Sequence, residues 1–469
     1  MATDGQQSWI RRVVLGNENL PDPDFPISHV PDTERKGLLS IAAVLLGFVF
    51  FAGTLFAGAE VGAAIGFVPM LAAMFVGYAI LGVYVATLCG IAAKAGLTAV
   101  LLARYSFGSY GAKFVSLLLG GTQVGWFGVT IPLIAGPTAS YFGLTGTFGG
   151  IVDITAVLIL IWGLLHLLTA YFGYEEMEKL SLVAVPILVI VGVLSIGIAV
   201  QDVGGVNELI GQGGGGEMTF AGAVTVVVGT FISGGTQAPN WARFARNHRV
   251  GFWAGLTAFL LGNGFLFLSG AVGGAVYADT TGGLFGVLTA QGLALIGLVA
   301  LGLNIWTTND NAAYAFGVAG SEAFDFDRKR PFVLAGGAVG ITIALAGAGN
   351  LLIPWLSTLG QYIPPLGGII VADFLVCRRM DIPHMDDVEF TSLRGTAVIA
   401  YSLGGLVAMF TAGQIIPGVP APAIIPGPVG ASFNGLITAF VVQVLAYYGL
   451  ETRGVLSGHV IDPDAELLS

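Results

Sequence analysis

The chain has 469 residues, of which 55% are hydrophobic and only 10% are charged, and its mean hydropathy is +0.85. This composition excludes an ordinary soluble domain and predicts an all-α protein that crosses a lipid bilayer many times. The net charge of −10 argues against nucleic acid or anionic lipid as a partner. The same acidity favours a salt-adapted prokaryotic source, although an ordinary acidic membrane protein would also carry it.

Apolar segments follow a polar N-terminal tail (1–37), in which we find no signal-peptide pattern. Each is long enough to cross the bilayer as one helix, whereas the stretch 96–107 is too short and is interpreted as an amphipathic interfacial segment. We therefore predict a polytopic protein with 12 transmembrane helices, at approximately residues 38–65, 68–93, 114–142, 150–172, 180–200, 220–241, 251–277, 290–317, 331–349, 352–377, 395–414 and 432–450.

The positive charges fall on one side of the predicted bundle. If the N-terminal tail is cytoplasmic, all 18 Lys and Arg residues lie in the tails or in cytoplasmic loops, and acidic residues such as Asp153 and Glu208 lie outside. Cytoplasmic loops of membrane proteins are enriched in Lys and Arg. We therefore predict a multi-pass protein of the plasma membrane, with the N-terminal tail and the C-terminal tail (451–469) both in the cytoplasm.

Two segments carry glycines in the middle of the predicted span. These glycines surround Phe50–Ala52 in the first segment and Phe231–Ser233 in the sixth. Such glycines can interrupt a membrane helix. Helix breaks at corresponding positions in the two halves of a chain are typical of inverted-repeat transporters, whose binding site lies near the middle of the bilayer. Close helix packing through glycine is the alternative. The spacing predicts two five-helix repeats, over 38–200 and 220–378, with two further helices at 395–450.

The eighth segment carries a polar stripe. Asn304, Thr307, Thr308 and Asn311 follow an i, i+3, i+4, i+7 spacing and therefore share one helix face. Polar groups at membrane depth are costly unless they meet a cavity, an ion or polar partners. Hydrogen bonding between helices is the ordinary alternative. The neighbouring Asp310 is interpreted as a buried structural acid, with a proton carrier as the alternative.

This stripe and the first break together could form a site for Na⁺. Thr307 and Thr308 offer hydroxyl oxygens and Asn304 offers its carbonyl, and the carbonyls near Gly47 and Phe50 could complete the shell. Hard cations prefer such oxygen ligands, and unwound backbone supplies them in transporters. A monovalent ion needs no carboxylate.

A second group of residues suits a flat, uncharged solute. Gln123 and Trp126 are three residues apart and project to one side of the third segment. The amide can donate and accept hydrogen bonds, and the indole offers a face for stacking. Phe231 in the sixth segment could form a second aromatic wall, with Ser233 at its polar edge. A nucleobase has this chemistry.

Four longer motifs resemble the cytosine permeases of the nucleobase–cation symporter family. They are GGTQVGWFG (120–128), FISGGT (231–236) with ARFARN (242–247) after it, GLNIWTTNDNAAYA (302–315) and IPPLGGIIVADF (363–374). The likeness runs from about Lys36 to Arg379 and more weakly through the last two helices. It implies a leucine-transporter-like fold with a 5+5 inverted repeat, and sodium-coupled uptake of cytosine by alternating access.

The resemblance also implies roles for single residues. The base would be bound by Gln123, Trp126, Phe231, Ser233, Phe51 and Asn304. The sodium site would comprise Gly47, Phe50, Asn304, Thr307 and Thr308, so that Asn304 touches both ligands. The chain departs from the family pattern at Pro239 and Asn240, where the family has Ala and Asp, and at Ala52, where a serine is usual.

Other functions remain open at this point. One alternative is a proton-coupled permease for another purine, pyrimidine or hydantoin/allantoin-type base. An alternative of another class is a nucleobase-binding membrane sensor or a passive facilitator. The sequence contains no Ser–His constellation and no His/Asp/Glu cluster with metal-ligand spacing, so we do not expect an enzyme. We expect Na⁺ as the coupling ion, with no organic cofactor and no obligate protein partner.

Overall fold

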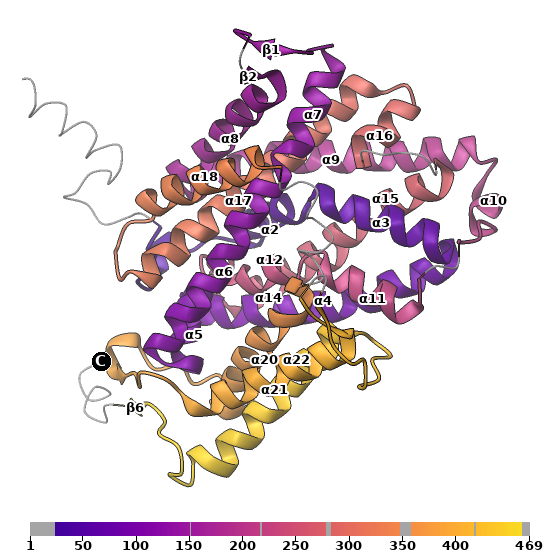
Figure 1. Ribbon diagram of the computed structural model, residues 1–469. Helices are drawn as coiled ribbons and strands as arrows, with labels where there is room; N and C mark the ends of the chain where they lie inside the picture. Colours follow the sequence, from indigo (N-terminus) through magenta and orange to yellow (C-terminus); the bar gives the residue numbers. More distant parts are fainter. Residues whose placement is uncertain are drawn as a thin grey trace, which may run out of the picture.

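The computed structural model describes residues 24–150, 152–215, 218–277, 283–347, 358–416 and 419–461, and most of them are helical (Figure 1). Most of the predicted N-terminal tail, the end of the C-terminal tail, the junction of the ninth and tenth predicted segments and the side chain of Ala52 lie outside the described residues. The strands form three short antiparallel pairs, β1 (Thr147–Phe148) with β2 (Val152–Asp153), β3 (Val388–Glu389) with β6 (Val460–Ile461), and β4 (Gln414–Ile416) with β5 (Val419–Pro420).

Eight helical runs of the described chain are long and apolar enough to cross a membrane. They are α4 (Phe67–Ala95), α6–α7 (Ser109–Tyr141), α8 (Ile154–Phe172), α9 (Tyr174–Asp202), α14 to α15 (His248–Val276), the run Thr358–Cys377 that holds α20 (Pro364–Ala372), α21 (Gly395–Ala412), and α22 (Ala431–Ala446) with its extension to Glu451. Two bent helix pairs raise this count to ten. α17 (Ala294–Ala323) and α18 (Arg330–Leu345) occupy the eighth and ninth predicted segments. The number of 12 spans is consistent with this arrangement and stays a prediction.

The two bent pairs lie where the sequence predicts breaks. The axes of α2 (Leu38–Val49) and α3 (Ala52–Ile65) differ by 63°, and those of α11 (Phe220–Gly229) and the run Ile232–Ala242 differ by 42°. That run contains α12 (Ile232–Gln237) and α13 (Pro239–Ala242). Pro239 is the first residue of α13, where proline needs no backbone N–H partner, so the chain continues as a helix past it.

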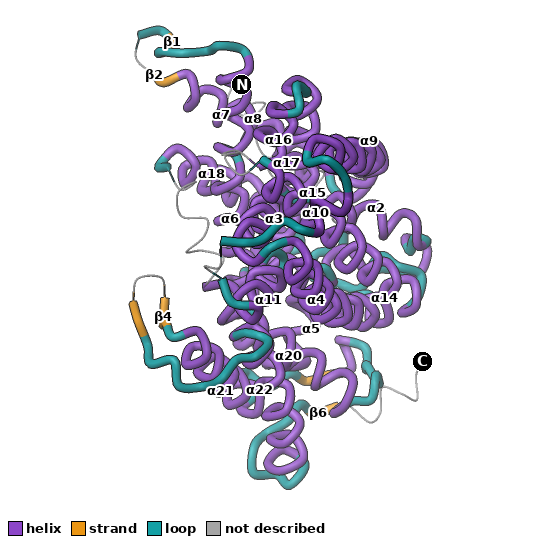
Figure 2. The backbone as a smooth tube through the Cα atoms, turned by 90° about the vertical axis from the view of Figure 1, so that its right-hand side faces the viewer, coloured by secondary structure: helices purple, strands orange, loops and turns teal. Residues whose placement is uncertain are grey.

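The polar stripe lies on α17, which packs against α2, α6, α8, α9 and α18. Asn304, Thr307 and Asn311 are 0% exposed, and Thr308 is 6% exposed. α21 and α22 lie together at one edge of the bundle, far from α8 and α18 (Figures 1 and 2). The stripe therefore faces the protein interior at the crossing of several helices, and it does not face lipid.

The stretch after the second span differs from the prediction. α5 (Ala99–Phe107) is too short to span, as expected, but every residue except Arg104 is buried, so it is no amphipathic surface segment. Its sequence is apolar on almost every side, and the Arg104 side chain is paired with the buried carboxylate of Glu322. The amide of Asn240 accepts a hydrogen bond from Ala99 N at 2.9 Å and so satisfies a free N–H at the start of the helix.

Replacing Asn240 with alanine should therefore destabilise the protein by about 1 kcal/mol, because the α5 terminus loses its buried acceptor. In thermal unfolding of the detergent-purified protein, we expect a Tm lower by roughly 1–2 °C. Asn207→Ala, at an exposed position of α10 (Val206–Ile210), is the matched control. Equal Tm values for the two variants would show that the Asn240 contact adds no stability.

The N-terminal segment 24–36 runs across one end of the bundle and is tied down by buried charges. Lys329 Nζ lies 2.8 Å from Asp24 Oδ2, and the two side chains are 1% and 6% exposed. The fully buried Arg243 donates to the Phe25 carbonyl at 2.6 Å and to the Tyr314 hydroxyl at 2.9 Å. This segment therefore joins the end of α13 to the start of α18, and Arg243 in turn bonds Tyr314 within α17.

Candidate functional site

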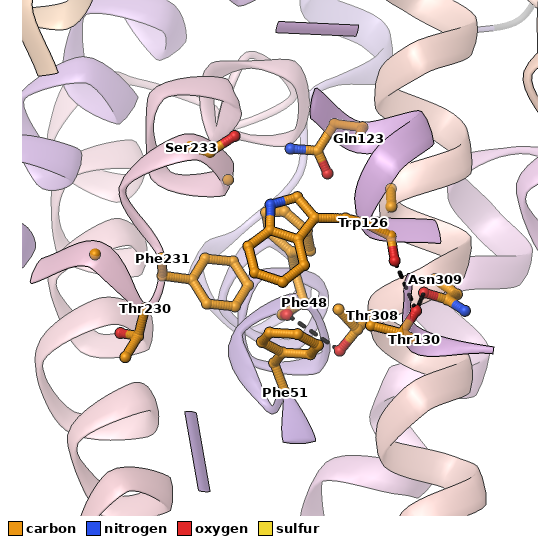
Figure 3. A pocket seen from close by; sticks show the side chains of 13 residues that line it. Phe48, Phe51, Gln123, Trp126, Thr130, Thr230, Phe231, Ser233, Thr308 and Asn309 are labelled. Carbon is orange, nitrogen blue, oxygen red and sulfur yellow. Dashed lines mark hydrogen bonds between the residues drawn. The ribbon is translucent and has the colours of Figure 1, made fainter. Parts of the chain in front are cut away.

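A narrow pocket of about 20 Å³ lies where the two helix breaks meet α6 (Ser109–Thr130) and α17 (Figure 3). The breaks expose residues that a continuous helix would turn away, and α6 and α17 close the remaining sides. The lining residues are Phe48, Phe51, Gln123, Trp126, Thr130, Gly229, Thr230, Phe231, Ser233, Gly234, Thr308, Asn309 and Ala312.

Aromatic rings dominate the walls. Trp126 comes from α6, and Phe231 and Phe51 come from the two breaks, so all three predicted aromatic residues line the same space (Figure 3). Phe51 meets Trp126 edge to face, with 5.1 Å between ring centroids, and meets Phe231 in the same way at 6.0 Å. Phe48, which the sequence reasoning missed, packs edge to face on Phe231 at 4.8 Å. These contacts hold the aromatic walls in place.

Gln123 and Ser233 lie at the polar edge of the pocket. Both are buried, with exposures of 1% and 2%. The Ser233 hydroxyl hydrogen-bonds the Thr122 hydroxyl at 2.8 Å. Gln123 Nε2 has no hydrogen-bond partner within the protein and points toward the side that carries Ser233 (Figure 3). A buried amide without a partner is costly, so this group is well suited to meet a hydrogen-bond acceptor on a ligand.

The five residues predicted for a cation lie together beside the pocket. The Asn304 carbonyl accepts hydrogen bonds from the hydroxyls of Thr308 at 3.0 Å and Thr307 at 3.2 Å. Thr308 Oγ1 also lies 3.1 Å from the carbonyl oxygen of Phe50, across the first break. A Cβ on Gly47 would lie 3.5 Å from Thr307 Cβ. Neutral oxygens of α2 and α17 therefore converge at the first break.

Asn304 differs from the other predicted base-binding residues because it does not line the pocket. Its side chain is fully buried, and neither its Oδ1 nor its Nδ2 has a hydrogen-bond partner within the protein. Its carbonyl lies beside the hydroxyls of Thr307 and Thr308, and its contacts with a base and with a cation both stay predictions. Asp310 also lies outside the pocket, and its carboxylate accepts from Asn311 Nδ2 at 2.9 Å.

Sequence reasoning assigned neither Thr130 nor Asn309 to the pocket. Both line the pocket, and Thr130 Oγ1 lies 2.6 Å from Asn309 Oδ1. Thr130 is four residues after Trp126, so it lies on the same face of α6, and this spacing could have identified it. In the part of the chain that the structure describes, no group of three or more His, Cys, Asp or Glu side chains could hold a metal ion.

Comparisons with known proteins identify the family of this chain. Residues 29–423 match the family model described as "Permease for cytosine/purines, uracil, thiamine, allantoin". The chain is 39% identical to the cytosine permease of Escherichia coli O157:H7 over 407 residues, which cover 87% of this chain and 93% of that protein. It is 22% identical to the allantoin permease of Bacillus subtilis over 363 residues, which cover 69% of this chain and 73% of that protein.

Among solved structures, Mhp1, a nucleobase-cation-symport-1 family transporter in a closed conformation with bromovinylhydantoin bound, has the same fold. Its TM-score is 0.75 at 19% identity, and the match covers 92% of this chain and 95% of that chain. A Na⁺-coupled sialic acid symporter matches with a TM-score of 0.67 at 11% identity, covering 97% of each chain. The predicted leucine-transporter-like, multi-spanning fold is therefore confirmed. The chain belongs to the family of membrane permeases for cytosine, purines, uracil, thiamine and allantoin, whose members are transporters and not enzymes.

Proposed function

We propose that this protein takes up cytosine, or a close nucleobase, by sodium-coupled alternating access. The observation that carries the proposal is the position of Thr308. This residue lines the aromatic pocket and also lies within hydrogen-bond distance of the carbonyls of Asn304 and Phe50. A base site and a cation site that share one residue can influence one another directly.

The pocket suits a nucleobase for chemical reasons. Trp126 and Phe231 offer aromatic faces, and base–aromatic stacking is favourable for every base because each has a π-face. Gln123 can donate to a ring carbonyl or nitrogen, while the Ser233 hydroxyl can donate or accept at another edge. No charged side chain is among the lining residues within the described chain, which suits a neutral solute. The similarity to cytosine permeases makes cytosine the first candidate.

The residues beside the pocket fit Na⁺ as the coupling ion. Gly47, Phe50 and Asn304 would supply carbonyl oxygens, and Thr307 and Thr308 would supply hydroxyl oxygens. The unpartnered Asn304 amide supports a ligand at this point, since a buried amide oxygen without a partner is costly. When bound, the cation would hold α17 against the first break at the end of α2. It would thereby favour the arrangement in which α2 and α17 are in contact there over one in which they are separated.

Uptake into proteoliposomes tests the proposal. An inward Na⁺ gradient should drive saturable accumulation of labelled cytosine, and excess unlabelled cytosine should compete better than uracil, adenine, hydantoin or allantoin. Accumulation under a proton gradient alone would contradict sodium coupling. Stronger competition by allantoin or hydantoin would favour the alternative of another base, for which the similarity to the allantoin permease provides support.

We further propose that both termini are cytoplasmic and that residues 38–200 and 220–378 form the two repeats, followed by the helices of 395–450. The clustering of Lys and Arg supports the orientation, and the two matched breaks support the repeats. A protease site fused after Ser469 should be cut in inside-out vesicles and protected in right-side-out vesicles. Adaptation to salt remains a prediction from the charge balance.

Gly47→Ala should weaken the apparent affinity for Na⁺ by about fivefold, which corresponds to about 1 kcal/mol of overpacking. The added Cβ would lie 2.3 Å from Ser181 Oγ on α9 and 3.5 Å from Thr307 Cβ, so α2 and α9 must move apart and α2 shifts relative to the α17 hydroxyls. Cytosine uptake measured over a range of Na⁺ concentrations tests this. Gly197→Ala, which has nothing within 4 Å of its added Cβ, should leave the sodium curve unchanged. Identical curves for both variants would argue against a cation site at Gly47.

A further inference from the structure

A chain of buried hydrogen bonds connects the wall that carries Trp126 to the helix that carries Thr308. Thr130 Oγ1, one helical turn after Trp126, lies 2.9 Å from the Trp126 carbonyl oxygen and 2.6 Å from Asn309 Oδ1 (Figure 3). Asn309 follows Thr308 directly in the chain. Thr130 and Asn309 are 0% and 1% exposed, so water does not compete for their hydrogen bond.

His166 on α8 holds the other end of the Asn309 amide. Asn309 Nδ2 lies 3.1 Å from His166 Nδ1, and because an amide nitrogen can only donate, the ring nitrogen accepts. The His166 ring lies among the rings of Trp162, Trp306 and Phe127, with centroid distances of 5.6, 5.9 and 6.5 Å. The imidazole is packed on several sides and cannot turn away easily. The Asn309 amide is therefore fixed by a donor on one side and an acceptor on the other.

This arrangement supports an inference that rests on the proposed function. We propose that Thr130, acting through an Asn309 amide oriented by His166, is a positioning residue that couples base binding to cation binding. A base stacked on Trp126 fixes this turn of α6, and a cation at Thr308 fixes this turn of α17. The Thr130–Asn309 hydrogen bond makes both events require the same spacing of the two helices. Filling one site therefore reduces the cost of filling the other, and the effect is reciprocal.

The test is the ratio of two cytosine dissociation constants, measured by titration calorimetry on purified protein with Na⁺ replaced by choline and with saturating Na⁺. Thr130→Val keeps the shape of the side chain and removes the hydroxyl, and we expect it to lower this ratio by roughly tenfold, within the range of measured couplings between sites. Thr130→Ser should restore the ratio. Thr130→Cys, with a weakly donating thiol, should give an intermediate ratio and serves in place of valine if that variant does not fold.

The control is Thr138→Val on α7 (Pro132–Tyr141). Thr138 Oγ1 makes the same bond to a carbonyl four residues back, at 2.7 Å, but its other partner is Trp162 Nε1 at 3.2 Å on α8 and not α17. The ratio of the cytosine dissociation constants of Thr138→Val without and with Na⁺ should match that of the wild type. A structural role would weaken both dissociation constants equally, and the ratio would not change.

A second variant tests the chain of hydrogen bonds that runs from His166 through Asn309 to Thr130. His166→Phe removes the acceptor for Asn309 and should lower the ratio as well, whereas His166→Gln, which retains an acceptor oxygen, should lower it less. Because both act through one amide, the double variant Thr130→Val/His166→Phe should lower the ratio no further than the stronger single variant. An unchanged ratio in Thr130→Val, or losses that add in the double variant, would overturn the inference and leave the proposed function intact. A wild-type ratio of one would overturn both the inference and sodium coupling.

Discussion

Trp126→Ala should lower the affinity for cytosine by about a hundredfold. Stacking of a base on an aromatic side chain contributes roughly 1–3 kcal/mol, and the empty space left by the indole adds to the loss. Trp126 is 8% exposed and forms the α6 wall of the pocket, where Phe51 supports it edge to face. The loss should therefore appear in the dissociation constant, measured by calorimetry in saturating Na⁺.

The matched control is Trp253→Ala on α14 (His248–Leu256), where the indole is 56% exposed and outside the pocket. It should bind cytosine as the wild type does. Trp126→Phe should recover part of the affinity because a ring face remains. If Trp126→Ala binds cytosine within about threefold of the wild type while remaining folded by its elution and Tm, the base does not stack on α6 and the assignment of this wall is wrong.

Thr308→Ala should raise the Na⁺ concentration that gives half-maximal cytosine uptake by at least about tenfold. Hydrogen bonds and contacts to a charged partner are worth roughly 1.5–3 kcal/mol, more than those between neutral groups. The Thr308 hydroxyl is the group placed within 3.1 Å of both Asn304 O and Phe50 O, and its removal takes away the link across the first break. Uptake at a very high Na⁺ concentration should approach the wild-type rate.

Two further variants separate a cation ligand from a helix-stabilising hydroxyl. Thr308→Ser keeps the oxygen and should show near wild-type sodium dependence. Thr342→Ala removes an exposed hydroxyl on α18 that bonds Ala338 O at 2.8 Å, the same backbone bond that Thr308 makes to Asn304, and should have no effect. Should Thr308→Ala slow uptake equally at every Na⁺ concentration, its hydroxyl would serve the fold and not the cation.

The parts of the site that depend on local spacing were predictable from sequence. The stripe on α17 follows from helical periodicity, and the breaks at Phe50 and Phe231 follow from glycine clusters that coincide in two halves. The helix that carries the stripe begins and ends a few residues after the approximate predicted segment 290–317. Gly292, with φ of 76°, separates α17 from α16 (Gly283–Ala290), and α17 continues to Ala323. The polar residues at its end are paired within the protein, so hydropathy gives no signal of its length.

Contacts between helices could not be predicted in the same way. Whether Thr130 meets Asn309, or whether Asn240 reaches the start of α5, depends on how helices far apart in sequence are arranged, and one sequence contains no direct measure of that. Burial of α5 was missed because an apolar stretch of nine residues looks alike at a membrane surface and inside a protein. The family motifs placed Gly47, Phe50 and Thr308 together because a resemblance carries tertiary information that periodicity lacks.

We expect the N-terminal segment 24–36 to affect the speed of the transport cycle. If the base leaves toward the end of the bundle that carries Arg243 and Lys329, the helices tied by this segment must separate there. The Lys329–Asp24 pair and the Arg243–Tyr314 hydrogen bond are buried, and separating buried partners without new ones is strongly unfavourable. Release at this end would then wait on water entering beneath residues 24–36, so this short stretch would set turnover while leaving the affinity for the base untouched.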